Sequence, residues 1–113
     1  MAYTAVNKST SHFNTKLYDG NGSAGHSITG VGFQPDLVWI KQRDSRDHFL
    51  FDAVNGATKY VASNTDAILS TDANTLTAFG VDGFTLGSGV GVNENADSHV
   101  SWNWKAGTTS GIT

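Results

Sequence analysis

Two apolar segments joined by a charged tip restrict the possible folds most strongly. They lie in residues 32–52, GFQPDLVWIKQRDSRDHFLFD. The first segment, Asp36–Arg43, alternates, so that Leu37 and Trp39 share one face and Val38 and Ile40 the other. The second segment, residues 48–54, is rich in Phe, Leu and Val. A strand with apolar residues on both faces lies inside a sandwich or under a partner. We therefore predict two adjacent strands near the centre of a β-structure.

Short strand-like segments and turn signals fill the rest of the chain. Further strands are predicted at residues 14–19, 26–31, 58–63, 75–79, 84–86 and 98–105. Asp82-Gly83 is the strongest hairpin signal. Residues 64–74 fit either a helical turn at Asp66–Leu69 or a loop with a short strand, and we favour the loop. Residues 87–97 are predicted to form a surface loop. About eight or nine strands predict an all-β antiparallel sandwich of the jelly-roll type with almost no helix, and a closed barrel is the alternative.

The length of 113 residues suits one domain. We expect an N-terminal arm at residues 1–13, with a short strand at Tyr3–Val6, a sandwich domain at 14–107 and a flexible tail or linker at 108–113. The residues expected to form the core are apolar and lie in the predicted strands or beside them: Leu17, Ile28, Phe33, Val38, Ile40, Phe49, Phe51, Phe79, Phe84, Leu86, Val100, Trp102 and Trp104.

Composition excludes several functional classes. The net charge of −3 argues against a nucleic-acid partner, because binding phosphates requires clustered Lys and Arg. The chain has no cysteine, which excludes disulfides and thiolate metal sites. No apolar run approaches the roughly 20 residues of a membrane span, so we expect no membrane insertion. The N-terminus lacks the basic and apolar regions of a signal peptide.

Candidate contact residues fall in three places. Trp39 and Tyr60 are strand aromatics on which a sugar could stack, although Trp39 fits the core nearly as well. The charged tip offers Arg43, Asp44, Arg46 and Asp47, which either pair locally or contact a partner. The loop near the C-terminus offers Asn93, Asn95 and Asp97, whose oxygens suit Ca²⁺ but whose spacing does not match an EF-hand. We therefore predict no metal and no cofactor.

Catalytic patterns are weak. No serine lies in a G-x-S-x-G nucleophile elbow. A glycosidase needs two facing carboxylates, and Asp52 is the one acid flanked by apolar strand residues. Capping of the turn before Asn55-Gly56 explains Asp52 better than catalysis does. An enzyme would require the fold to bring Asp52 together with Asp82 or Asp97, and we predict that the chain is not an enzyme.

Several motifs in order carry a resemblance to a known family. They are GVGFQPDLVWIKQR, LFDAVNGATKY, DGFTLGS and VSWNWKAG, which lie between residues 30 and 107. The match as a whole covers residues 13–107. The chain resembles a small domain of tail-fibre and virion surface proteins of bacteriophages, notably marine ones, which is similar to concanavalin-like and SPRY-like sandwiches. The resemblance implies a jelly-roll without catalytic residues, and a structural or adhesive role in the virion.

Two functional expectations follow from the residues and the resemblance. The first is a non-enzymatic virion module, in a tail fibre or another surface protein, that is made in the host cytoplasm and contacts other virion proteins or the host surface. The resemblance implies a homo-oligomer, with a trimer as one form. The short chain, which departs from the longer proteins of the family, leaves open an excised domain or a standalone capsid decoration protein. The second expectation is a lectin-like domain that binds a host-surface glycan.

Overall fold

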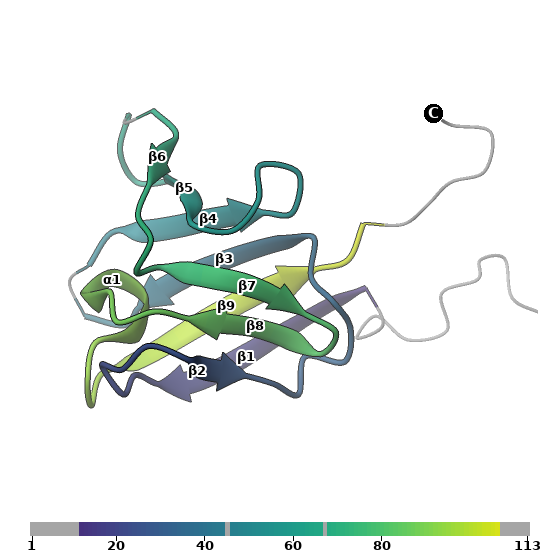
Figure 1. Cartoon of the computed structure of the whole chain (residues 1–113), viewed down its shortest axis with the longest axis horizontal. Helices are drawn as coiled ribbons and strands as arrows, with labels where there is room; N and C mark the ends of the chain where they lie inside the picture. Colours follow the sequence, from purple (N-terminus) through teal and green to yellow (C-terminus); the bar gives the residue numbers. More distant parts are fainter. Residues whose placement is uncertain (1–11, 45, 67, 107–113) are drawn as a thin grey trace, which may run out of the picture.

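Two antiparallel sheets pack face to face in a computed structural model that describes residues 12–44, 46–66 and 68–106 (Figure 1). The large sheet has the order β1 (Phe13–Asp19), β9 (Ser98–Trp104), β3 (Leu37–Gln42), β4 (His48–Asp52), β5 (Lys59–Ala62) and β6 (Ser70–Thr71). The small sheet has the order β2 (His26–Ile28), β8 (Gly83–Leu86) and β7 (Leu76–Gly80). A short helix, α1 (Val90–Asn93), is the one helix of the described residues. The predicted antiparallel sandwich with almost no helix is confirmed.

The predicted central hairpin is present. β3 pairs with β4 from Leu37↔Asp52 to Lys41↔His48, and it pairs with β9 on its other side. β3 therefore has a strand on each edge and a covered inner face. That position explains why apolar residues occur on both of its faces, since one face packs on the small sheet and the other meets residues of β4 and β9.

The core lies between the two sheets. Its fully buried residues come from both sheets and from α1: Ile28, Val38, Ile40, Phe51, Leu76, Phe84, Leu86 and Val92. Phe33 is also buried, while Phe49 and Phe79 are half-buried and pack against this cluster. These positions confirm most of the predicted core, because the alternation in β3, β4 and β8 placed the apolar residues correctly.

The predicted core was wrong for β1 and β9. Leu17 is 67% exposed, and Val100, Trp102 and Trp104 are half-buried on the outer face of the large sheet. The inner face of β9 instead carries His99, Ser101 and Asn103, all fully buried. Ser101 Oγ donates to Lys16 O at 3.3 Å, and Asn103 Nδ2 donates to Asn14 O at 3.1 Å. Hydrogen bonds to the neighbouring strand thus allow Ser101 and Asn103 to occupy an interior face, and the His99 ring stacks on Tyr18 with centroids 5.1 Å apart.

The hairpin between β7 and β8 also anchors the β2–β3 loop. Asp82 at its tip accepts hydrogen bonds from Gly30 N at 2.9 Å and Gly32 N at 2.7 Å. These two backbone donors lower the pKa of Asp82. A Cβ on Gly83 would lie 1.9 Å from Ile28 O, so only glycine allows β8 to approach β2 here.

The loops differ partly from expectation. The favoured short strand within residues 64–74 is present as β6, and Asp66, Ile68 and Leu69 are not helical. The segment 87–97, predicted as a surface loop, contains α1, whose Val92 and Asn93 are buried. Phe13, predicted to end the arm, begins β1. The predicted strand at Tyr3–Val6 and the tail at 108–113 lie outside the described residues.

Candidate functional site

The outer face of the large sheet gathers the chain's tryptophans. The strand register places Leu37, Trp104 and Phe13 in one row across β3, β9 and β1, and Trp39 and Trp102 in the next. Leu50 of β4 extends the second row, opposite Trp39. We call these half-buried residues the aromatic face: Phe13, Leu37, Trp39, Leu50, Trp102 and Trp104.

Ring contacts make the aromatic face continuous. The Trp39 and Trp102 ring centroids lie 5.3 Å apart at 55°, and those of Phe13 and Trp104 lie 5.1 Å apart at 49°. His48 packs on Trp39 with centroids 5.9 Å apart. Such tilted pairs are favourable arrangements for aromatic rings. The small sheet and α1 pack on the opposite face, so these rings are not part of the inter-sheet core.

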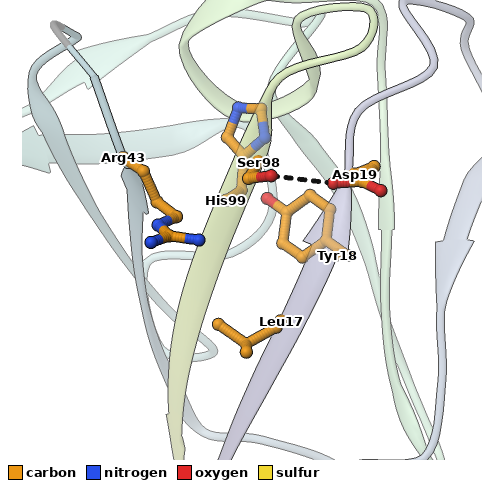
Figure 2. A pocket seen from close by; sticks show the side chains of 6 residues that line it. All are labelled: Leu17, Tyr18, Asp19, Arg43, Ser98 and His99. Atoms are coloured by element: carbon orange, nitrogen blue, oxygen red, sulfur yellow. Dashed lines mark hydrogen bonds between the residues drawn. The ribbon is translucent and has the colours of Figure 1, made fainter.

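The aromatic face ends in a charged row. Arg43, Ser98 and Asp19 follow one another across three neighbouring strands, because Arg43 N donates to Ser98 O and Ser98 pairs with Asp19. Figure 2 shows Ser98 Oγ donating to Asp19 Oδ1, at 2.9 Å, beside a cavity of about 210 Å³ that Leu17 also lines. Among the described residues, the Arg43 guanidinium has no hydrogen bond or ion pair. It is therefore available to an outside partner.

Three of the predicted contact residues border one polar hollow. Arg43, Asp44 and Asp97 line it together with Ala96 and Ser98, and its volume is about 360 Å³. Asn95 is exposed in the adjacent turn. The structure thus brings the charged tip and the C-terminal loop together, which their separation in the sequence did not indicate.

Three other predicted residues border a second cavity. Arg46, Asp47 and Tyr60 line a volume of about 240 Å³ together with Phe49 and Asp72. Phe49 and Asp72 were not predicted as contact residues. Phe49 was assigned to the core, and no sequence signal distinguished Asp72 from other loop acids.

A network of buried and exposed polar groups lies between these two hollows. Gln42 Nε2 donates to Glu94 Oε2 at 2.5 Å and to Asp97 Oδ2 at 2.7 Å. Arg46 binds Glu94 through Nε at 3.2 Å and Nη2 at 3.1 Å. The Arg46 hydrogen bond, followed by that from Gln42, lowers the pKa of Glu94 to about 2. Glu94 is therefore ionised at neutral pH, where it cannot donate a proton as a general acid.

This ion pair corrects the interpretation of the charged tip. Local pairing within residues 43–47 was one of the two expectations. The Arg46 side chain instead pairs with Glu94, which is 48 positions away. The tip is thus tied to the segment after α1.

The Asn93 side chain is buried and holds neighbouring loops together. It is fully buried, and its amide nitrogen donates to Asn21 Oδ1, Ser23 O and Gly87 O, all at 3.0 Å. Its oxygen accepts from Asn21 N at 2.9 Å and is bonded to His26 Nδ1 at 2.8 Å. The prediction of Asn93 as a contact residue was wrong, because the interior of the protein already satisfies its amide.

The acids considered for catalysis are engaged in different turns. Asp52 accepts hydrogen bonds from Asn55 N at 2.6 Å and Asn55 Nδ2 at 2.8 Å, as a turn cap does. Asp82 binds the β2–β3 loop, and Asp97 binds Gln42. No hydrogen bond connects Asp52 with either of the other two among the described residues. Their geometry gives no support to a facing pair of acids.

No group of three or more His, Asp or Glu side chains is placed to hold a metal ion in the part of the chain that the structure describes. Over the same residues, no helix has the length and apolar character needed to cross a membrane.

One family model matches the chain over residues 8–113, and it is described as a domain of unknown function, DUF7483. No curated protein and no solved structure matches the chain.

Proposed function

We propose that this chain, which belongs to the DUF7483 family of domains of unknown function, is a non-enzymatic structural module of a virion. In this proposal it assembles with a second copy of itself through the aromatic face. The observation that carries the proposal is the placement of all three tryptophans of the sequence on the outer side of the large sheet.

The size of the aromatic face fits a protein contact. Four strands about 4.8 Å apart carry the aromatic face, and its two rows are separated by about 7 Å along the strands. Its backbone positions therefore cover roughly 14 by 7 Å, and the large side chains extend the surface beyond them. The largest apolar patch of a monomer is typically about 300–600 Å² and is often functional. A standard interface buries about 800 Å² on each partner. The aromatic face therefore supplies the apolar centre of a contact, and its charged row with Arg43 and Asp19 supplies part of the rim.

The motifs of the phage resemblance support the virion setting. VWIK contributes Trp39, and VSWNWK contributes Trp102 and Trp104, so these two motifs build the aromatic face. In the virion, the same module would contact other virion proteins or the host surface, as part of a tail fibre or as a capsid decoration protein. A homotrimer is one form that the resemblance implies for this assembly.

The mass of the protein in solution tests this proposal. We expect analytical ultracentrifugation to show a dimer or trimer that dissociates on dilution, and we expect Trp102→Ser to shift the equilibrium toward the monomer. Val81→Ser is a matched control, because Val81 is 86% exposed outside the aromatic face. A wild-type chain that stays monomeric at its highest soluble concentration would remove self-assembly from the proposal.

A further inference from the structure

We propose that the cavity beside Tyr60 binds one neutral or amino-bearing sugar ring of a saccharide. This cavity is separate from the aromatic face, since Tyr60 and Phe49 pack against the core on the inner side of the sheet. Its volume is about 240 Å³. Sites for drug-sized ligands measure about 300–1,000 Å³, so this one suits a single ring.

The floor of the cavity is aromatic. The Phe49 and Tyr60 ring centroids lie 4.6 Å apart at 40°, and Phe51 in the core lies 6.0 Å from Tyr60 and 6.3 Å from Phe49. Contact with buried Phe51 holds both rings in place. A fixed aromatic surface of this kind packs against the apolar C–H face of a sugar.

The rim supplies hydrogen-bond acceptors. Asp72 Oδ1 accepts from Asn74 N at 2.9 Å, and Asp47 Oδ1 accepts from Asn64 Nδ2 at 3.1 Å. Among the described residues, the second oxygen of each carboxylate has no hydrogen bond, and neither does the Tyr60 hydroxyl. Ionised carboxylates only accept hydrogen bonds, which suits the hydroxyl or ammonium donors of a sugar.

The charges of the rim favour some sugars over others. Among the described residues, Arg46 is the one cation that lines the cavity, and Glu94 binds its guanidinium. Asp47 and Asp72 give the lining a formal charge of −1 even when Arg46 is counted. Because like charges repel, an acidic sugar should bind less well than a neutral or amino sugar.

Close backbone packing makes the cavity preformed. A Cβ on Gly91 would lie 2.6 Å from the Phe49 ring, so the α1 backbone rests directly on the aromatic floor. Gly89 N donates to Asn74 O at 2.7 Å, which joins the start of α1 to the β6–β7 loop that carries Asp72. A preformed site loses little conformational entropy when it binds a ligand.

Titration by heteronuclear NMR tests the site. The probes are the methyl glycosides of glucose, galactose and mannose, glucosamine, glucuronic acid and choline. We expect at least one neutral or amino sugar to shift the amides of residues 47, 60, 72 and 91 in a saturable way. Asp72→Asn keeps the acceptor for Asn74 N and loses one carboxylate acceptor, so it should weaken binding roughly tenfold. Asp66→Asn, an exposed acid outside the cavity lining, is the matched control.

Several outcomes would overturn the site. They are the absence of saturable shifts with every sugar, shifts centred on the Trp39 and Trp102 indoles, equal binding by glucuronic acid, and binding by choline alone. Equal weakening by Asp66→Asn would also count against it. Because the readout is local to the cavity, it is independent of the oligomeric state that tests the aromatic face.

Discussion

At the scale of single residues, Glu94 connects three parts of the molecule through charge. Its carboxylate accepts from Arg46 of the β3–β4 tip and from Gln42 at the end of β3. Gln42 is 1% exposed, and its amide also donates to Asp97. The network therefore joins the tip to the segment between α1 and β9, and it depends on Glu94 being ionised.

Stability should fall at acid pH through this residue. The pKa of Glu94 is lowered from 4.5 to about 2 in the folded chain, first by Arg46 and then by Gln42. A lowered pKa contributes stability above the ordinary value, and this contribution is lost as the pH falls from about 4.5 toward 2. We expect Glu94→Gln to lower the urea midpoint at pH 7, and we expect the gap to wild type to shrink across this window. A gap that stays constant with pH would contradict the assigned ion pairing.

The sequence predicted the residue types at the tip better than their partners. Arg43, Asp44, Arg46 and Asp47 were expected to pair locally or contact a partner, since they are adjacent in the chain. The partner of Arg46 comes from a loop 48 positions away, which only the folded sandwich brings close. Local charge patterns carry no information about such long-range contacts.

At the scale of elements, Asn93 fixes α1 and two loops to each other. A helix of four residues has almost no stability of its own. Forming the first turn fixes several backbone dihedral angles, and the single hydrogen bond gained does not offset that loss of conformational entropy. The Asn93 side chain compensates by binding Asn21 and Ser23 of the β1–β2 loop and Gly87 after β8. The same helix forms part of the wall of the Tyr60 cavity through Gly91.

Removal of the Asn93 amide should destabilise the whole chain. Asn93→Ala leaves the buried Gly87 O and the partly buried Ser23 O and Asn21 N without their side-chain partner, and an unpaired buried group costs about 1–3 kcal/mol. Since the loops can relax toward water, we expect the free energy of unfolding to fall by about 2–4 kcal/mol in urea denaturation. Asn95→Ala is the matched control, because Asn95 is exposed and its side chain should matter by less than about 0.5 kcal/mol. Equal effects from both variants would contradict the role assigned to Asn93.

Strands were predictable where alternation and turn residues agreed. β3, β4 and the β7–β8 hairpin lie where periodicity and Asp82-Gly83 placed them. α1 was not predicted, because VGVN within a Gly- and Asn-rich segment has no helical periodicity, and tertiary hydrogen bonds impose the helix. In β9 the alternation gave the two faces correctly. It could not show which face is inside, because hydrogen bonds to β1 make the polar face suitable for the interior.

At the scale of the whole molecule, the large sheet has one apolar face in the core and a second that is half-exposed. In monomeric proteins, the outer face of an antiparallel sheet usually carries polar residues. Here the inner face of β9 is polar and the outer face carries Trp102 and Trp104. This inversion shows that the outer aromatic residues are not needed to fill the inter-sheet core. The Tyr60 cavity lies beside the opposite, inner layer, so the two proposed contacts do not compete for one surface.

A comparison of two aromatic deletions tests this assignment of the faces. Phe51 is 1% exposed in the core, so Phe51→Ala should lower the free energy of unfolding by about 3–5 kcal/mol at every protein concentration. Trp102 has its ring pair with Trp39 and remains half-exposed, so Trp102→Ala should cost only about 1–2 kcal/mol in dilute protein. If copies associate through the aromatic face, wild-type stability rises with protein concentration by mass action, and Trp102→Ala loses that gain. The difference in unfolding free energy between wild type and Trp102→Ala should then grow with concentration, while the difference for Phe51→Ala stays constant. Equal losses for both variants in dilute protein would mean that Trp102 is packed as deeply as Phe51, and the aromatic face would then have no free surface to offer a partner.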